Sequence, residues 1–369
     1  MPTSPSAGGD EPPPRLLKRW GIAAPAPPAP LARHGWRVDA ESGSYFLKEH
    51  GPGERRRVRF QHRVTAALDA AGLPVLAPVP AAGGGRTLVT AGGRCFALYP
   101  WVAGRRRDGL ELTFGQCERL GELLGELHAA LDRLTAPVQQ SLLVPTPRAA
   151  DAVAAIDAML AALPADGAGR GGDFAALTER RLRERRALLT ELADHQPPEI
   201  EVSTVGHLHG SFHEGHLRYG GSGNVTAVLG WGSLTTGPVA GELVRAAAAL
   251  FAYGDERGLD LDRVQSFVGG HRAAFPLDAG QIQSAVHREW WERLCDVAPL
   301  RHRYLGDGAE PAGGPAPGER TGGAGTGAMG GGAALVSWWS AHLETTLDAF
   351  AVPYTAAPAG TPGGSPAYG

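Results

Sequence analysis

The chain of 369 residues has little of several residue types, and each shortage excludes a class of protein. Its three cysteines, Cys95, Cys117 and Cys295, lie far apart and are odd in number, which excludes a disulfide framework and is typical of a reducing cytoplasm. No run of 18 apolar residues and no apolar leader occurs, so neither a membrane span nor an export signal is predicted. A net charge of −3 gives no general attraction to nucleic acid or to anionic lipid. We therefore predict a cytoplasmic protein with neither a nucleic-acid nor a membrane partner.

Lysine is also scarce, because only Lys18 and Lys48 are found among 35 basic residues. The excess of arginine, with abundant alanine and glycine, is typical of GC-rich coding DNA, and it makes each lysine a candidate functional residue. A length of 369 residues fits one large two-lobed domain or two ordinary ones. Hydrophobic residues make up 43% of the chain and charged residues 20%, which is enough apolar side chain to bury a sizeable core.

Glycine (53) and proline (30) are gathered in a few stretches, which divide the chain. The ends and one internal stretch are expected to lie outside the core, although 15–20 could form one or two helical turns. The predicted parts are a Pro/Ala-rich extension (1–30), a small sheet with one helix (31–100), a mostly helical lobe (101–304), a Gly-rich disordered linker (305–334), a C-terminal helix (335–352) and a disordered tail (353–369).

The pattern of the first part predicts strands at 35–40 and 44–48 joined by a tight turn, and two more at 87–90 and 95–99. Between the two pairs, the apolar spacing over 55–71 predicts a helix that stops at Gly72. In the second part, helical periodicity is interrupted by a loop at 205–217 and a hairpin strand at 225–231. The helices expected there are 115–134, 151–163, 174–192, 242–253, 261–275 and 279–294.

This order of elements is that of a kinase-like phosphotransferase. The segments 44–48 (SYFLK), 101–105 (WVAGR), 120–131 (LGELLGELHAAL) and 207–216 (HLHGSFHEGH) resemble the aminoglycoside phosphotransferase and choline kinase superfamily, and within it the spore-coat kinase-like branch. The resemblance covers about residues 15–304. It implies an α+β, protein-kinase-like, two-lobed fold, with a small antiparallel sheet and one helix in the N-lobe and a larger, mostly α-helical C-lobe.

The most specific motifs of that family are altered in this chain. The catalytic loop HGDxHxxN reads HGSFHEGH at 209–216, and the strand that ends in I-D-W/F-D reads VLGWG at 228–232. The family resemblance implies that the loop Asp accepts the proton of the attacking hydroxyl, and that the loop Asn and strand Asp hold Mg²⁺. Ser211, His216 and Gly230 stand at these positions, and none supplies a carboxylate or carboxamide oxygen. No functional catalytic residue is therefore expected, and His209 and His213, which match family positions, are expected to brace the loop.

Lys48 is retained at the position that, by the resemblance, binds nucleotide phosphates. Its usual glutamate partner has no clear counterpart, because Gln61 and His62 stand near that position and Glu54 comes too early. Lys48 either binds a phosphate or ends its strand in solvent. The prediction is nucleotide binding through Lys48, with ATP bound without Mg²⁺ and its base against the connector at 99–102.

Other clusters have simpler interpretations. The histidines at 207, 209, 213 and 216 suggest a transition-metal site, but loop bracing explains two of them, so no metal site is predicted. The arginines at 55–57, 59 and 63, and those at 105–107, are solvated faces or sites for a phosphate or an acidic partner. The tryptophan pairs at 290–291 and 338–339 are assigned to packing.

The leading hypothesis is a pseudokinase that binds a small molecule, a nucleotide or a partner protein. One alternative is an active ATP-dependent phosphotransferase acting on a small hydroxylated metabolite or an aminoglycoside, with carboxylates from Glu214, Glu242 or Asp255. Another is a structural, envelope-associated scaffold, which is suggested only by the spore-coat branch.

Overall fold

The computed structural model describes residues 11–13, 15–32, 34–135, 141–143, 146–162, 172–297 and 327–351, and it divides into two compact units. The first unit joins Met1–Glu111 to Leu127–Val138 and Gly206–Glu242; the second contains Leu112–Glu126, Gln139–Val205 and Leu243–Gly369. The first carries an antiparallel sheet and the second is mostly helical, which confirms the α+β class. Within the described ranges, no helix has both the length and the apolar character needed to cross a membrane.

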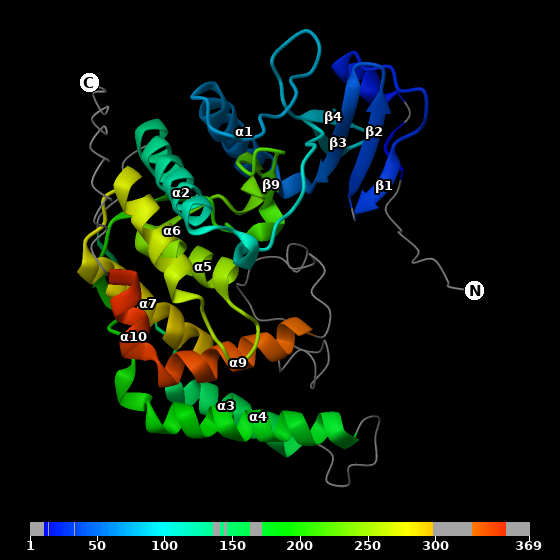
Figure 1. Ribbon diagram of the computed structural model, residues 1–369. Helices are drawn as coiled ribbons and strands as arrows, with labels where there is room; N and C mark the ends of the chain where they lie inside the picture. The colour runs from blue at the N-terminus through cyan, green and yellow to red at the C-terminus, as the bar shows by residue number, and fades with distance from the viewer. Residues whose placement is uncertain are drawn as a thin grey trace, which may run out of the picture. The chain divides into compact units, whose positions relative to one another are not determined.

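The main sheet has five antiparallel strands in the order β1-β2-β3-β5-β4. Their bounds are β1 Ala29–Ala32, β2 Gly35–Ala40, β3 Gly43–His50, β4 Val89–Ala91 and β5 Arg94–Pro100 (Figure 1). The predicted hairpin is confirmed, with Ala40 opposite Gly43 and Gly43 at a φ of 129° that favours glycine. The predicted helix is α1, Arg55–Ala70, and Gly72 follows it in a left-handed conformation.

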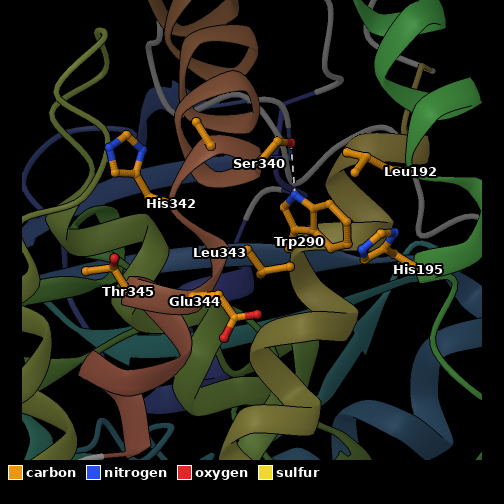
Figure 2. Close-up of a pocket in the computed structure, with 9 residues that line it drawn as sticks. Leu192, His195, Trp290, Ser340, His342, Leu343, Glu344 and Thr345 are labelled. Atoms are coloured by element: carbon orange, nitrogen blue, oxygen red, sulfur yellow. Dashed lines mark hydrogen bonds between the residues drawn. The ribbon is translucent and has the colours of Figure 1, made fainter.

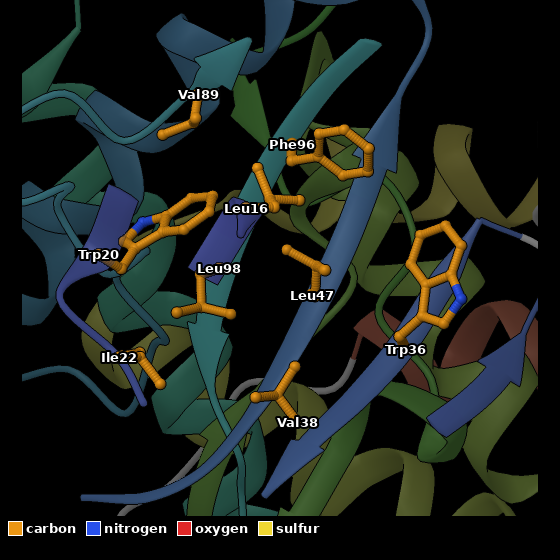
Figure 3. Packing of buried hydrophobic residues seen from close by; sticks show 9 residues of the cluster. All are labelled: Leu16, Trp20, Ile22, Trp36, Val38, Leu47, Val89, Phe96 and Leu98. Carbon is orange, nitrogen blue, oxygen red and sulfur yellow. The ribbon is translucent and has the colours of Figure 1, made fainter. Parts of the chain in front are cut away.

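The core of this sheet includes residues from the N-terminal extension (Figure 3). Leu16 and Trp20 belong to the short helix η1, Leu16–Trp20, and they pack with Ile22 against Leu47 of β3. The Trp20 indole N–H also donates to the Val79 carbonyl at 3.0 Å. The expectation that the extension lies outside the core was therefore wrong for this segment. Its apolar side chains cover a sheet face that water would otherwise contact, and burial of such area is the main stabilising term in folding.

Two short strand pairs complete the first unit. They are β9 (Leu217–Tyr219) with β10 (Val225–Val228), and β8 (Val205–Leu208) with β11 (Thr235–Pro238). Val228 donates its N–H to the Pro74 carbonyl at 2.7 Å, and Arg105 and Tyr219 exchange two backbone hydrogen bonds. These bonds explain why 206–242, predicted as part of a C-lobe over 101–304, belongs with the sheet.

The remaining helices agree with the predicted ones to within a few residues. They are α2 Phe114–Leu134, α3 Ala149–Ala162, α4 Gly172–Glu191, α5 Val239–Phe251, α6 Leu261–Ala274 and α7 Ala279–Cys295, with β6 (Ser141–Leu143) paired to β7 (Ile200–Val202). In the second unit, α2 and α6 approach closely at Gly121 and Gly270, because a Cβ at either position would overlap backbone of the other helix.

The C-terminal part differs from the prediction of one helix over 335–352. It contains α9, Gly327–Ala341, and α10, Leu343–Ala351. They separate at His342. Its backbone N–H donates to the Trp339 carbonyl, and its ring Nδ1 donates to the Trp338 carbonyl, which in a continuous helix would accept the His342 backbone N–H. Helix α9 begins inside the predicted linker, and the linker up to 326 and the tail at 353–369 lie outside the described residues. Trp290, Trp291 and Trp339 are buried, as predicted.

Replacing Trp20 by alanine tests the role of the extension. The variant should lose about 3–5 kcal/mol of unfolding free energy, because it leaves a cavity and an unpaired Val79 carbonyl. Denaturant unfolding measures this loss, and Leu31→Ala at a side chain that is 55% exposed is the control, expected within about 0.5 kcal/mol of wild type. Equal stability of Trp20→Ala and wild type would show that the segment does not support the sheet.

Candidate functional site

The altered loop, 209–216, lies between β8 and β9 and is held by one buried carboxylate. Glu242, near the start of α5, accepts the backbone N–H of His209 on Oε2 at 2.9 Å and that of Gly210 on Oε1. Nε2 of His128, from α2, lies 2.8 Å from Oε2. Both carboxylate oxygens are therefore used to position the loop.

The charge of Glu242 is also set by these contacts. Burial alone would raise the pKa of the carboxyl, but the hydrogen bond and charge of His128, together with the Gly210 N–H, outweigh burial, so the pKa lies below its ordinary value. The side chain is 3% exposed, which leaves no face of the carboxylate for a substrate. Glu242, one of the carboxylates of the active-enzyme alternative, thus has a positioning role here.

His209 braces the loop from inside, as predicted. Its Nδ1 accepts the Ser211 N–H at 3.2 Å, so Nε2 carries the proton and donates to the Leu229 carbonyl at 2.6 Å. The ring is fully buried against Trp231, at 4.8 Å between ring centroids. Burial lowers the pKa of His209 to about 4, so the ring is neutral at physiological pH.

The three substituted family positions lie together, and His216 fills the space between them. Its Nδ1 donates to the backbone carbonyl of Ser211 at 2.7 Å. Gly230 has a φ of 85°, and a Cβ built there would overlap the His216 ring. The imidazole therefore occupies the volume that a side chain at position 230 would need.

The other two histidines of the loop region have separate contacts. His213 accepts the Gly215 N–H on Nδ1 at 3.1 Å, and its ring lies 4.3 Å from that of His216. His207 lies 2.8 Å from the Thr135 hydroxyl and 5.8 Å, between ring centroids, from Phe60. Across the described parts of the chain, no group of three or more His, Cys, Asp or Glu is arranged to hold a metal ion.

The donor set at the family's metal position does not fit Mg²⁺. Magnesium requires hard oxygen ligands in near-octahedral geometry, whereas this site offers an imidazole and a glycine. The Ser211 carbonyl is already the acceptor of a hydrogen bond from His216. Of the remaining carboxylates, Glu214 lies in the short helix η5, Glu214–His216, and Asp255 belongs to the second unit and pairs with Arg257 at 2.7 Å.

Lys48 lies half-buried on β3, opposite Gly35 of β2 and Ala97 of β5. No ion pair of this lysine with a carboxylate is found in the residues the structure describes. Glu54 accepts the Gly51 N–H at 2.8 Å instead. The lysine ammonium is thus left without the acidic partner that the family resemblance implies.

Helix α1 is joined to the segment that follows Gly230, a connection that the sequence analysis missed. Gln61 donates its amide N–H to the Gly232 carbonyl at 2.9 Å, and the Arg57 guanidinium donates to the same oxygen. His62, the other candidate partner of Lys48, lies between the hydroxyls of Thr87 (2.7 Å) and Tyr99 (2.8 Å). No local sequence signal indicates these bonds, since their partners are far apart in the chain.

Burial shifts the pKa values of His62, of its partner Tyr99 and of the nearby His50. It lowers the pKa of His50 to about 3, with a smaller contribution from Lys48, and that of His62 to about 4. Burial also raises the pKa of the Tyr99 hydroxyl. The Tyr99 hydroxyl, near the end of β5, is therefore neutral and bonded to His62.

A separate hollow of about 230 Å³ lies in the second unit (Figure 2). Trp290 points into it, and its indole N–H donates to the Ser340 hydroxyl at 3.0 Å. His195 and His342 also line it, but none of the predicted catalytic or nucleotide-binding residues does.

The chain matches a known protein family. A model of the phosphotransferase enzyme family matches residues 31–276, which is more than half of the chain. A search of curated proteins finds no match.

Solved structures with a similar fold include a spectinomycin phosphotransferase bound to AMP, at a TM-score of 0.53 and 16% identity, covering 79% of this chain and 92% of that one. A putative aminoglycoside phosphotransferase from Ralstonia eutropha JMP134 has a TM-score of 0.52 and 14% identity, with 89% and 96% covered. A microcompartment-associated aminopropanol kinase has a TM-score of 0.50 and 18% identity, with 92% and 98% covered. At these identities the likeness establishes the fold.

The buried neutral histidines predict a specific loss of stability in mild acid. Below pH 6.5 the unfolded chain binds protons at positions 50, 62 and 209, whereas the folded chain does not until about pH 3–4. The free energy of unfolding should therefore fall as pH drops from 6.5 towards 4, by up to about 1.4 kcal/mol per pH unit for each histidine.

The variant His62→Gln keeps a hydrogen-bonding side chain that does not titrate. Its free energy of unfolding should fall less steeply with decreasing pH than that of the wild type, by the contribution of one histidine. Urea unfolding at pH 7.5, 6.5 and 5.5 measures it. Parallel curves for the variant and the wild type would mean that His62 binds its proton equally in both states.

Proposed function

This chain belongs to the phosphotransferase enzyme family, and we propose that it is a pseudokinase, in which an imidazole takes the place of the magnesium site and the fold serves to bind a nucleotide or another small molecule. The membership confirms the resemblance to the aminoglycoside phosphotransferase and choline kinase superfamily drawn from the sequence. The observation that carries the proposal is the overlap between the His216 ring and the side-chain position of Gly230.

The two substitutions fit each other. A glycine at position 230 makes room for the imidazole, and the imidazole, bonded to the Ser211 carbonyl, fills that room. Loss of a general base reduces the rate of a reaction by about 10²–10⁴, and loss of metal stabilisation costs several kcal/mol more, although the two effects are not additive. A packed and hydrogen-bonded replacement supports a role that does not need phosphoryl transfer.

Lys48 supports nucleotide binding as that role. A half-buried ammonium without an acidic partner is suited to a phosphate group, which it would bind as a point charge. We propose ATP as the nucleotide, bound without Mg²⁺. The three cysteines are buried free thiols, which supports a cytoplasmic location.

Substitution back towards the family residues tests the overlap directly. Gly230→Asp alone should lose about 1–3 kcal/mol, because the new side chain meets the His216 ring and a φ disfavoured for it. In the double variant with His216→Asn, the steric part of that loss should be recovered, giving a coupling energy of about 1 kcal/mol or more. Unfolding of the four proteins in urea completes the cycle. A Gly230→Asp variant as stable as the wild type with His216 present would remove the observation on which the proposal depends.

Thermal shift with ATP tests the binding role. ATP should raise the melting temperature by the same amount in EDTA and in excess Mg²⁺, since a ligand that binds only the folded state stabilises it according to its concentration over its Kd. Lys48→Ala should reduce the shift, and Lys18→Ala, at the only other lysine, should retain it in full. No phosphorylated product should form from aminoglycosides or choline. A shift that requires Mg²⁺, with turnover that Lys48→Ala abolishes, would instead support the active phosphotransferase.

A further inference from the structure

An arginine-lined hollow of about 590 Å³ lies along the first half of α1. It is lined by Arg55, Arg56, Arg59, Phe60 and Arg63. These positions fall within about 140° of the helix circumference at 100° per residue. Arg57 and Gln61, which bond to Gly232, lie on another face of the helix and do not line the hollow.

The arginines of this face are not neutralised by the protein. In the described part of the chain, no ion pair joins Arg55, Arg56, Arg59 or Arg63 to a carboxylate, and Arg55 Nε is shielded from water without a hydrogen-bond partner. Helix α1 itself has no acidic residue before Asp69. Four like charges over about 12 Å of helix repel one another. Their placement on one face therefore has a cost in stability, which the arginine-rich composition does not explain.

Helix α4 provides the comparison within the same chain. It is equally rich in arginine, but there Arg183 pairs with Glu179 at 2.6 Å, Arg180 with Glu184 at 3.5 Å and Arg186 with Asp157 at 2.6 Å. An arginine-biased composition explains the number of arginines in both helices. It does not explain why acidic partners accompany one group and are missing from the other.

The hollow also has an aromatic surface at a fixed place. Phe60 is half-buried, with the His207 ring 5.8 Å from it and the Arg63 guanidinium 5.7 Å from its centroid. Guanidinium groups bind phosphate oxygens in bidentate fashion, and an aromatic face packs against the apolar part of a ligand.

We propose that this face of α1 is a binding site for a small molecule that carries several phosphate groups, separate from the nucleotide site at Lys48. Four unneutralised guanidiniums match a multiply charged anion rather than a single phosphate. A hollow bounded by side chains of one helix favours a compact ligand over an extended acidic peptide.

Calorimetric titration with tripolyphosphate at low salt tests the site. The wild-type protein should bind, and Arg56→Gln/Arg59→Gln/Arg63→Gln, at three exposed side chains, should weaken binding at least tenfold without lowering the melting temperature. The matched control Arg180→Gln/Arg183→Gln/Arg186→Gln removes the same charge from three exposed positions of α4 and should bind like the wild type. Lys48→Ala should also bind like the wild type, which separates this site from the proposed nucleotide site.

Three results with tripolyphosphate would overturn the proposal. The first is no binding to the wild type. The second is an equal loss in both triple variants, which would indicate general charge attraction. The third is loss in Lys48→Ala, which would place the anion in the nucleotide site. A polyglutamate peptide that binds as tightly as tripolyphosphate would also overturn it, in favour of an acidic protein partner.

Discussion

The geometry of the altered loop depends on one buried carboxylate. Glu242 receives two consecutive backbone N–H groups of the loop and contacts His128, so that three groups from α2, α5 and the loop are fixed at one point. A charge in this position is tolerated only because each oxygen has a donor, since an unpaired buried carboxylate would be strongly disfavoured. The loop therefore keeps a defined backbone even though the residues that would use it for phosphoryl transfer have changed. The contacts of Glu242 position this backbone without using the side chains at 211, 216 or 230.

Much of the fold could be predicted from the sequence because its signals are local. Alternation and a Gly-containing turn define the β2–β3 hairpin, and apolar spacing with a glycine stop defines α1. The errors occur where tertiary contacts decide. Leu16 and Trp20 stand in a Pro/Ala-rich stretch whose composition suggests no core, yet they and Ile22 pack in the apolar core of the sheet. The break at His342 depends on a ring-to-carbonyl bond that periodicity does not reveal.

The sequence identifies which residues of the site are changed, but it does not show how they are arranged in space. Motif spacing is enough to locate Ser211, His216 and Gly230 as the changed positions. It does not indicate that the imidazole lies in the volume of the missing side chain, because that requires the path of the backbone through a left-handed glycine. The bonds from Arg57 and Gln61 to Gly232 could not be predicted from the sequence either, because about 170 residues separate the partners. Gln61, which a motif search would match to a lysine partner, bonds instead to the Gly232 carbonyl in the turn that follows β10.

The fit of His216 against Gly230 also bears on how substitutions at the two positions combine. An acidic side chain introduced at 230 meets the ring, and an amide introduced at 216 leaves a void beside a glycine that can coordinate nothing. Each single substitution therefore has a cost in stability that the other relieves in part. The two positions form one packing unit, so a change of chemistry at this site requires both residues to change together.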